Sequence, residues 1–214
     1  MANAYFIFMG FLQLYKPISQ PGAWITTFMS VVFISGVSAV KDALEDAKRH
    51  SSDAEENNRF CKGLPFGSEK TEEMTSSDIQ VGMLVKVKED EFFPCDMYIL
   101  NSSLKKGLCF IETKNLDGET NLKHKQVDKT ILELEVSESN FKDKFEGASI
   151  ECETPNEFLY KFEGTVTLKD GTLAPMEPDQ ILLRGSSLRN TEWVIGVCVF
   201  TGHETKIMMN SAKA

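Results

Sequence analysis

Charge is distributed very unevenly along this chain of 214 residues. Lys16 is the only charged side chain in residues 1–40, and two apolar runs, 1–15 and 24–40, lie on either side of it. The second run has 17 uncharged residues, which is the short end of the roughly 17–25 residues that span a bilayer. This pattern predicts a transmembrane helical hairpin at the start of the chain and a polar remainder outside the membrane.

The segment between the two runs favours a sharp reversal. Pro17, Pro21 and Gly22 all disfavour a continuous helix. Residues 41–50 are good helix formers and include the i,i+4 pair Lys41 and Glu45, so we expect the second helix to continue beyond the membrane. The hairpin with this extension is therefore predicted to occupy residues 1–50, and the basic residues after position 40 favour the cytosolic side for its end.

Two other interpretations of the apolar runs stay open. The first run could be a signal peptide, although it lacks a basic start and an obvious small-residue cleavage site. Both runs could also form a buried helix pair in a soluble protein, because they lie at the lower limit of spanning length.

The remainder of the chain has the pattern of a β-domain. Residues 51–78 are polar and predict a connector with little core of its own. From Ile79 onward, short apolar runs alternate with glycine and asparagine turns, which predicts an all-β sandwich or barrel-like domain over residues 79–206. The runs expected to form strands are 81–87, 92–100, 108–111, 158–162, 165–168, 181–183 and 193–200. The fold class predicted is thus mixed, a transmembrane helical hairpin followed by a mainly-β domain.

Composition excludes several functions. A net charge of −9 and a pI near 5.0 argue against nucleic acid as a partner, because there is no basic patch to neutralise phosphates. Five cysteines stand singly with no CxxC pair, which indicates free thiols in a reducing compartment. The three histidines lie far apart in the sequence, so no metal site is expected in this chain.

A carboxylate on a glycine turn is the strongest candidate for chemistry. Asp117-Gly118-Glu119-Thr120 follows an apolar run and precedes a basic, polar stretch. Asp-Gly favours a tight turn, because glycine tolerates the positive φ that such turns often need. A stiff loop of this kind can present Glu119 outward to position or deprotonate a water molecule. An ordinary surface turn with two solvated acids is the alternative.

Several motifs spread over the chain resemble those of the type IV P-type ATPases, the phospholipid flippases. They occur in the family's order and cover nearly the whole chain, although Gln20 and Cys95 depart from the usual proline and alanine. No counterpart of the phosphorylation motif, the nucleotide-binding domain or the later membrane helices is present. The chain is therefore expected to be a fragment, with residues 207–214 leading to a missing third membrane helix. The matching strings are Pro17-Ile18-Ser19, Lys41-Asp42, Glu45-Asp46, Arg49-His50, Phe92-Phe93-Pro94-Cys95-Asp96, Leu116-Asp117-Gly118-Glu119-Thr120-Asn121-Leu122-Lys123, Leu183-Arg184-Gly185, Leu188-Arg189-Asn190-Thr191-Glu192-Trp193 and Thr201-Gly202-His203-Glu204-Thr205-Lys206.

The resemblance implies a mechanism. Residues 79–206 would be the actuator domain, with a distorted jelly-roll-like fold, which swings its loop onto an aspartyl phosphate formed by ATP in another domain. Glu119 would activate the attacking water, Gly118 and Thr120 would shape the loop, and Asp117 would fix the turn. The resemblance also implies that the full enzyme uses ATP and Mg²⁺, neither bound by this segment.

The resemblance further implies partners and a location. Ile18, Ser19 and Gln20 would lie along the path of a phospholipid substrate. The expected partners are the phosphorylation and nucleotide-binding domains of the full pump and an accessory glycoprotein subunit. The full protein would be a multi-pass protein of the plasma membrane or an endomembrane, with residues 79–206 in the cytosol.

Two other functions remain open. A cation-pumping P-type ATPase is one, although such pumps carry Thr-Gly-Glu-Ser where this chain has Asp117-Gly118-Glu119-Thr120. The other is a membrane-anchored β-domain without turnover that serves as a binding or regulatory module. Whether the native chain extends past Ala214 discriminates between this module and a segment of a pump.

Overall fold

The structure is a computed structural model that describes residues 8, 11, 23–65 and 71–211. The chain divides into two compact units, Met1–Glu56 and Asn57–Ala214. The lipid-path candidates Ile18, Ser19 and Gln20 lie outside the described residues, and so does most of the first apolar run.

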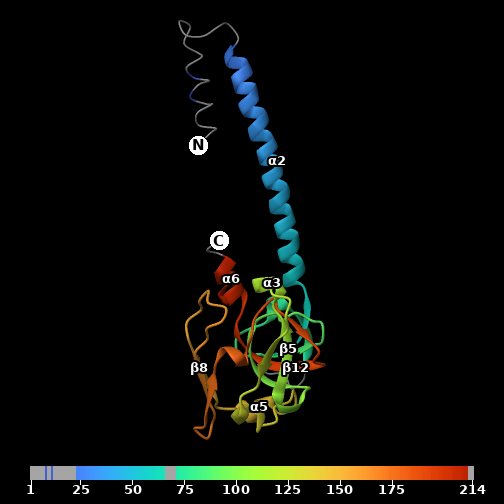
Figure 1. Cartoon of the computed structure of the whole chain (residues 1–214), viewed down its shortest axis with the longest axis vertical. Coiled ribbons are helices and arrows are strands. Elements are labelled where there is room, and N and C mark those ends of the chain that lie inside the picture. The colour runs from blue at the N-terminus through green and yellow to red at the C-terminus, as the bar shows by residue number, and fades with distance from the viewer. Residues whose placement is uncertain (1–7, 9–10, 12–22, 66–70, 212–214) are drawn as a thin grey trace. The chain divides into compact units, whose positions relative to one another are not determined.

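One long helix dominates the described part of the first unit. Helix α2 runs without interruption over Ala23–Asn57, 35 residues (Figure 1). It includes the predicted extension at 41–50, where Lys41 Nζ lies 3.3 Å from Glu45 Oε1, one helical turn away. Such i,i+4 pairs favour the helix by a few tenths of a kcal/mol. The helix also takes in residues 51–57, which we expected to belong to the connector.

The prediction of a transmembrane hairpin in the fold class is wrong. Among the residues that the structure describes, no helix is both long enough and apolar enough to cross a membrane. The uncharged run at 24–40 has 17 residues, at the lower limit of spanning length, and the same helix passes directly into the charged residues from Lys41 onward. A β-domain is present, as the remainder of the chain predicts.

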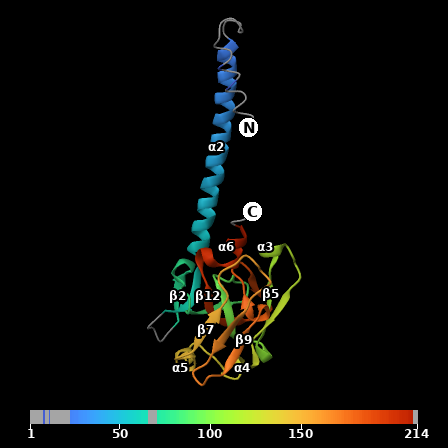
Figure 2. The same ribbon diagram turned by 90° about the vertical axis from the view of Figure 1, so that its left-hand side faces the viewer.

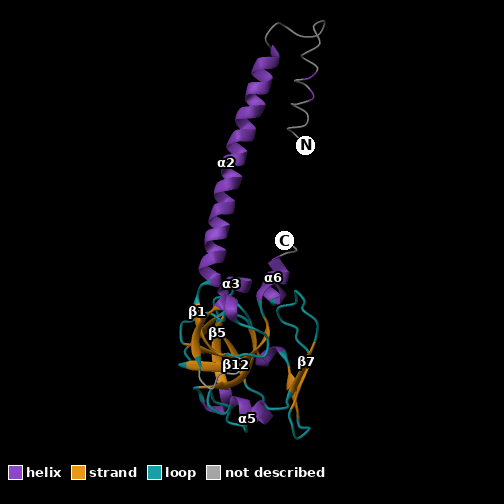
Figure 3. Ribbon diagram, turned by 180° about the vertical axis from the view of Figure 1, so that it is seen from behind, coloured by secondary structure: helices purple, strands orange, loops and turns teal. Residues whose placement is uncertain are grey.

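The β-domain contains three antiparallel sheets in the described part of the chain (Figure 3). The largest has six strands in the order β10-β4-β12-β3-β1-β2, and two smaller sheets have the orders β11-β5-β6 and β7-β8-β9. The strands are β1 Phe60–Leu64, β2 Glu72–Thr75, β3 Leu84–Lys88, β4 Asp96–Ser102, β5 Leu108–Glu112, β6 Lys123–Gln126, β7 Ser149–Cys152, β8 Gly164–Thr167, β9 Leu173–Met176, β10 Ile181–Leu182, β11 Ser187–Arg189 and β12 Trp193–Phe200.

The core is centred on β4 and β12, which pair with each other inside the large sheet. Nearly every residue of both strands is buried, so both faces are covered. This explains why they appear in the sequence as continuous apolar runs and not as strict alternation. Gly196 in β12 lets the strands approach closely, since a Cβ there would lie 2.6 Å from the Tyr98 carbonyl oxygen.

Short helices occupy the two ends of the β-domain. Helices α3 (Lys114–Asp117) and α6 (Lys206–Ser211) lie at one end, and α4 (Lys129–Leu132) and α5 (Phe141–Phe145) lie at the other (Figures 1 and 2). Four 3₁₀ turns complete the described elements: Ser76–Asp78, Lys105–Gly107, Pro178–Gln180 and Gly202–Glu204.

The strand pattern differs from the prediction in several places, and β6, β7, β9 and β11 all lie outside the runs expected to form strands. Strands β1 and β2 come from the expected connector and extend the large sheet. The run at 158–162 was expected to be a strand, and it is a loop. The side-chain Oδ1 of Asn156 accepts a hydrogen bond from the Phe158 N–H (3.1 Å), which makes a local turn in place of a strand ladder.

Candidate functional site

The candidate loop begins where β5 ends. Thr113 precedes the single-turn helix α3, and Gly118 closes that helix in the left-handed conformation with φ 76°. The Gly118 N–H donates to the Lys114 carbonyl oxygen at 3.0 Å, as in a helix C-cap. Glycine adopts this φ without the steric cost that a Cβ would add, so the chain turns sharply and projects Glu119 away from the helix.

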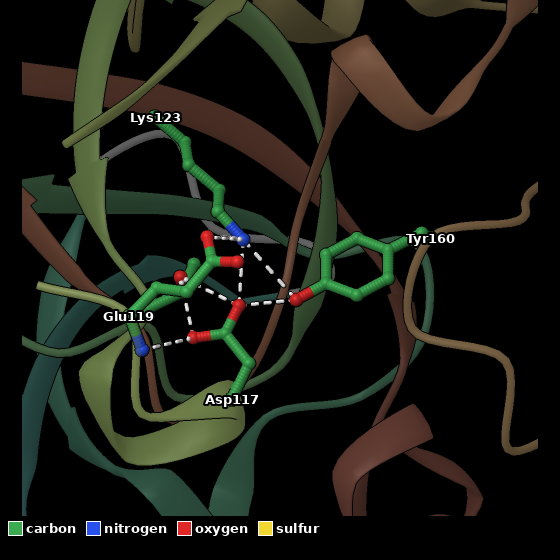
Figure 4. Close-up of polar contacts among 5 residues, drawn as sticks. Asp117, Glu119, Lys123 and Tyr160 are labelled. Carbon is green, nitrogen blue, oxygen red and sulfur yellow. Dashed lines mark hydrogen bonds and ion pairs between the residues drawn. The ribbon is translucent and has the colours of Figure 1, made fainter. Parts of the chain in front are cut away.

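Asp117 is the centre of the hydrogen-bond network in this loop (Figure 4). Its carboxylate accepts from Thr113 Oγ1 (3.0 Å), Glu119 N (2.9 Å), Lys123 Nζ (2.6 Å) and the hydroxyl of Tyr160. Burial acts to raise the pKa of Asp117, but these hydrogen bonds, that from Lys123 first, hold it well below its usual range. An anionic carboxylate with four donors fixes the turn and is poorly suited to accept a proton.

Glu119 is the accessible carboxylate of the loop. Its side chain is 59% exposed, against 13% for Asp117. Lys123 Nζ lies 2.9 Å from Glu119 Oε2, so one ammonium bridges both acids. Burial acts to lower the pKa of Lys123, but the bonds to Asp117 and then Glu119 raise it above its usual value, and the side chain stays charged. Thr120 follows with an exposed side chain.

Tyr160 joins the site from a distant part of the sequence. It lies between β7 and β8, in the loop that was expected to be a strand. Its hydroxyl accepts from Lys123 Nζ at 3.1 Å, and the ammonium lies 4.6 Å from the centre of its ring. The sequence singles out the motif residues, but no local signal places Tyr160 beside them. Lys123 could have been noticed, because it stands four residues after Glu119.

A second network holds three of the other motif segments together. Asp96 is fully buried at the start of β4, and its carboxylate accepts from the main-chain N–H groups of Arg184 and Lys206, both at 2.8 Å. Burial raises the pKa of Asp96 to about 6, despite these two bonds. Asp96 therefore ties the segment after β10 and the start of α6 to the large sheet.

Lys206 connects this network to the loop that carries Tyr160. Its buried ammonium donates to Glu153 Oε1 and Asn156 Oδ1, both at 2.8 Å. Helices α3 and α6 also approach each other at Gly185, where a Cβ would lie 3.4 Å from Ile207 and 3.7 Å from Leu116. The motif segments thus support the Asp117–Glu119 loop although they are far apart in the sequence.

The acids of this site are not arranged as a metal centre. Within residues 23–65 and 71–211, no group of three or more His, Cys, Asp or Glu side chains is placed to hold a metal ion. Lys123 occupies the space between the two loop carboxylates.

Comparison with known proteins identifies relatives of the whole chain, although no protein-family model matches it. Phospholipid-transporting ATPase 6 of Arabidopsis thaliana is 46% identical over 216 residues, which cover 100% of this chain and 17% of the relative. Phospholipid-transporting ATPase IC of Mus musculus is 41% identical, covering 99% of this chain and 16% of the relative. Phospholipid-transporting ATPase DRS2 of Saccharomyces cerevisiae is also 41% identical, with coverages of 98% and 15%.

These matches bear directly on the motifs. The identity extends over all or nearly all of this chain, while the chain spans less than a fifth of each relative. The chain is thus homologous over essentially its full length to one segment of the phospholipid-transporting ATPases, which confirms the family that its motifs indicate.

Proposed function

We propose that this chain is the actuator segment of a phospholipid-transporting P-type ATPase, with residues 79–206 as the actuator domain. In this proposal its loop hydrolyses an aspartyl phosphate that ATP and Mg²⁺ form on another domain of the full protein. The full protein then works in a membrane on a phospholipid, together with its phosphorylation and nucleotide-binding domains and an accessory glycoprotein subunit. The identity of 41–46% to phospholipid-transporting ATPases, which extends over 98–100% of this chain, supports this assignment over a cation pump.

The observation that carries the catalytic part is the difference between the two acids of the loop. Asp117 is largely shielded and bound by four donors, whereas the Glu119 side chain is 59% exposed on the same stiff turn. Glu119 can therefore reach a water molecule between the loop and a docked phosphate, and Asp117 cannot. Such a base contributes about 10²–10⁴-fold to a rate.

The neighbouring residues take supporting roles in this mechanism. Gly118 has no heavy atom within 4 Å of the position that a Cβ would occupy, so the loop is open on that side to an approaching phosphate. Thr120 is exposed next to Glu119 and would complete the surface presented to the phosphorylated domain. Ile18, Ser19 and Gln20 remain the candidates for contact with the lipid.

The test is the turnover of phosphoenzyme in the full-length protein. Glu119→Gln keeps the size of the side chain but removes the base. We expect it to form phosphoenzyme from radiolabelled ATP normally and to lose the label about 10²–10⁴-fold more slowly after a chase with unlabelled ATP. Glu146→Gln, which changes an exposed carboxylate after α5, is the matched control. Normal decay of the phosphoenzyme in Glu119→Gln would overturn the assignment.

A further inference from the structure

We propose that Tyr160 is a positioning residue for this dephosphorylation, because it holds Lys123 and Asp117 and through them fixes the Glu119 carboxylate. The inference rests on the proposed function of the loop. It concerns a residue outside the matching motifs, and 43 positions separate it from Asp117.

The hydroxyl of Tyr160 is used in both directions at once. It donates to the Asp117 carboxylate and accepts from Lys123 Nζ at 3.1 Å (Figure 4). The face of its ring also receives the same ammonium at 4.6 Å. Phenylalanine would retain the ring but neither hydrogen bond, so the two contributions can be separated by a single substitution.

Burial does not explain this position of Tyr160. The residue is 56% exposed, so packing against apolar neighbours contributes little to holding it over the loop. Polar contacts anchor the segment instead. The Lys206 ammonium holds Glu153 and Asn156, and the Glu153 N–H donates to the Glu163 carbonyl oxygen (2.9 Å) to close the base of the loop. Tyr160 thus lies in a loop, residues 153–163, that hydrogen bonds hold at both ends.

The ammonium of Lys123 links Tyr160 to Glu119. An ammonium group has three N–H donors, and among the described residues it meets three oxygen acceptors, on Asp117, Glu119 and Tyr160. Removal of the Tyr160 hydroxyl leaves one N–H of the Lys123 ammonium without its acceptor, and the ammonium can then turn away from Glu119. Because a displacement of about 1 Å can cost a reaction about 10²-fold, the Glu119 carboxylate would lose part of its effect.

The experiment compares Tyr160→Phe with Tyr98→Phe in the full-length protein. Tyr98 is a matched control, because its hydroxyl also donates a hydrogen bond, to the Pro175 carbonyl oxygen (3.2 Å), and not to the loop. We expect Tyr160→Phe to slow phosphoenzyme decay about tenfold and to leave its formation from ATP within about twofold of wild type. A tenfold change in rate is about 1.4 kcal/mol, which lies within the range that hydrogen bonds to charged groups contribute. Tyr98→Phe should decay like the wild type.

A double-mutant cycle tests whether Tyr160 acts through Lys123. If it does, Tyr160→Phe will slow decay less in a Lys123→Met background than in the wild-type background, where the Lys123 contact is also lost. Any of three results would overturn the proposal. The slowing by Tyr160→Phe and that by Lys123→Met could multiply in the double variant, Tyr160→Phe could decay like the wild type, or Tyr98→Phe could slow decay as much as Tyr160→Phe. Glu119→Gln is measured in parallel. If Glu119→Gln traps phosphoenzyme while Tyr160→Phe decays normally, only the inference about Tyr160 fails. If Glu119→Gln does not trap phosphoenzyme, the proposed function of the loop fails.

Discussion

The main-chain N–H of Lys206 donates a 2.8 Å hydrogen bond to Oδ2 of Asp96, although 110 positions separate the two residues. The other carboxylate oxygen accepts from the Arg184 N–H at the same distance. Asp96 thus holds the start of α6 and the turn after β10 against β4. Since the carboxylate is fully buried, its protonation state bears on the stability of the whole β-domain.

Replacement of Asp96 by asparagine should change how stability depends on pH. Burial raises the pKa of Asp96 from 3.8 to about 6. A group with a raised pKa in the folded state stabilises the fold at low pH, and this contribution is lost as pH rises through about 6. Between pH 4.5 and 7.5 the loss is about 2 kcal/mol, at about 1.4 kcal/mol for each unit of pKa shift. Asp96→Asn should lack this loss.

Urea unfolding at the two pH values measures this effect. The advantage of wild type over Asp96→Asn in free energy of unfolding should be about 2 kcal/mol smaller at pH 7.5 than at pH 4.5. Asp143→Asn removes an exposed carboxylate and controls for the change in net charge. A constant difference between Asp96→Asn and wild type would contradict the prediction.

The ion pair of Lys206 should contribute more to stability than a surface pair of the same kind. Lys206→Met keeps the length of the side chain but removes the ammonium that donates to both Glu153 and Asn156. Loss of one partner from a buried pair costs about 3–5 kcal/mol. The Glu153 side chain is 24% exposed, so water can partly replace the lost ammonium. We therefore expect Lys206→Met to lower the free energy of unfolding by about 2 kcal/mol.

The matched control for this prediction is Lys169→Met. Lys169 pairs with Glu146 at 3.0 Å, but both side chains are at least 70% exposed, so the change should cost under about 0.5 kcal/mol. Equal losses in the two variants, measured by urea unfolding at one pH, would show that burial of Lys206 adds nothing to its ion pair.

The sequence predicts the local parts of this site better than the tertiary ones. Asp117 and Gly118 can be assigned to a turn because the residue types themselves favour it. Tyr160 and Lys206 could not be placed, because their contacts join positions 43 to 110 apart and depend on how the sheets pack.

The same limit explains the errors in the fold. Apolar character alone made residues 158–162 resemble a strand, whereas Asn156 makes a turn there. The lack of charge at 24–40 predicted a membrane span, but the run has only 17 residues, and no helix of the described residues is both long and apolar enough to cross a membrane.

Addition of a methyl group at Gly196 should force β12 away from β4. A Cβ at this position would lie 2.5 Å from Met97 Cε and 2.6 Å from the Tyr98 carbonyl oxygen. Methionine can move, but the main-chain oxygen cannot without a shift of the strand, so Gly196→Ala should cost about 2–3 kcal/mol. Gly36→Ala, in the exposed part of α2 with open space around it, should instead stabilise its helix by up to about 1 kcal/mol. Thermal unfolding followed by circular dichroism would measure both.

Gly118→Ala should separate the shape of the loop from the stability of the domain. Gly118 has φ 76° and open space around its Cβ position, so alanine would meet backbone strain but no clash. The cost is about 1 kcal/mol, and relief of the strain would rotate the chain just before Glu119. Gly171 has φ 83° and equally open space, but it lies in the turn between β8 and β9. Both variants should lose similar stability, and only Gly118→Ala should slow phosphoenzyme decay in the full-length protein. Equal decay in the two variants would mean that the conformation of Gly118 has no part in catalysis.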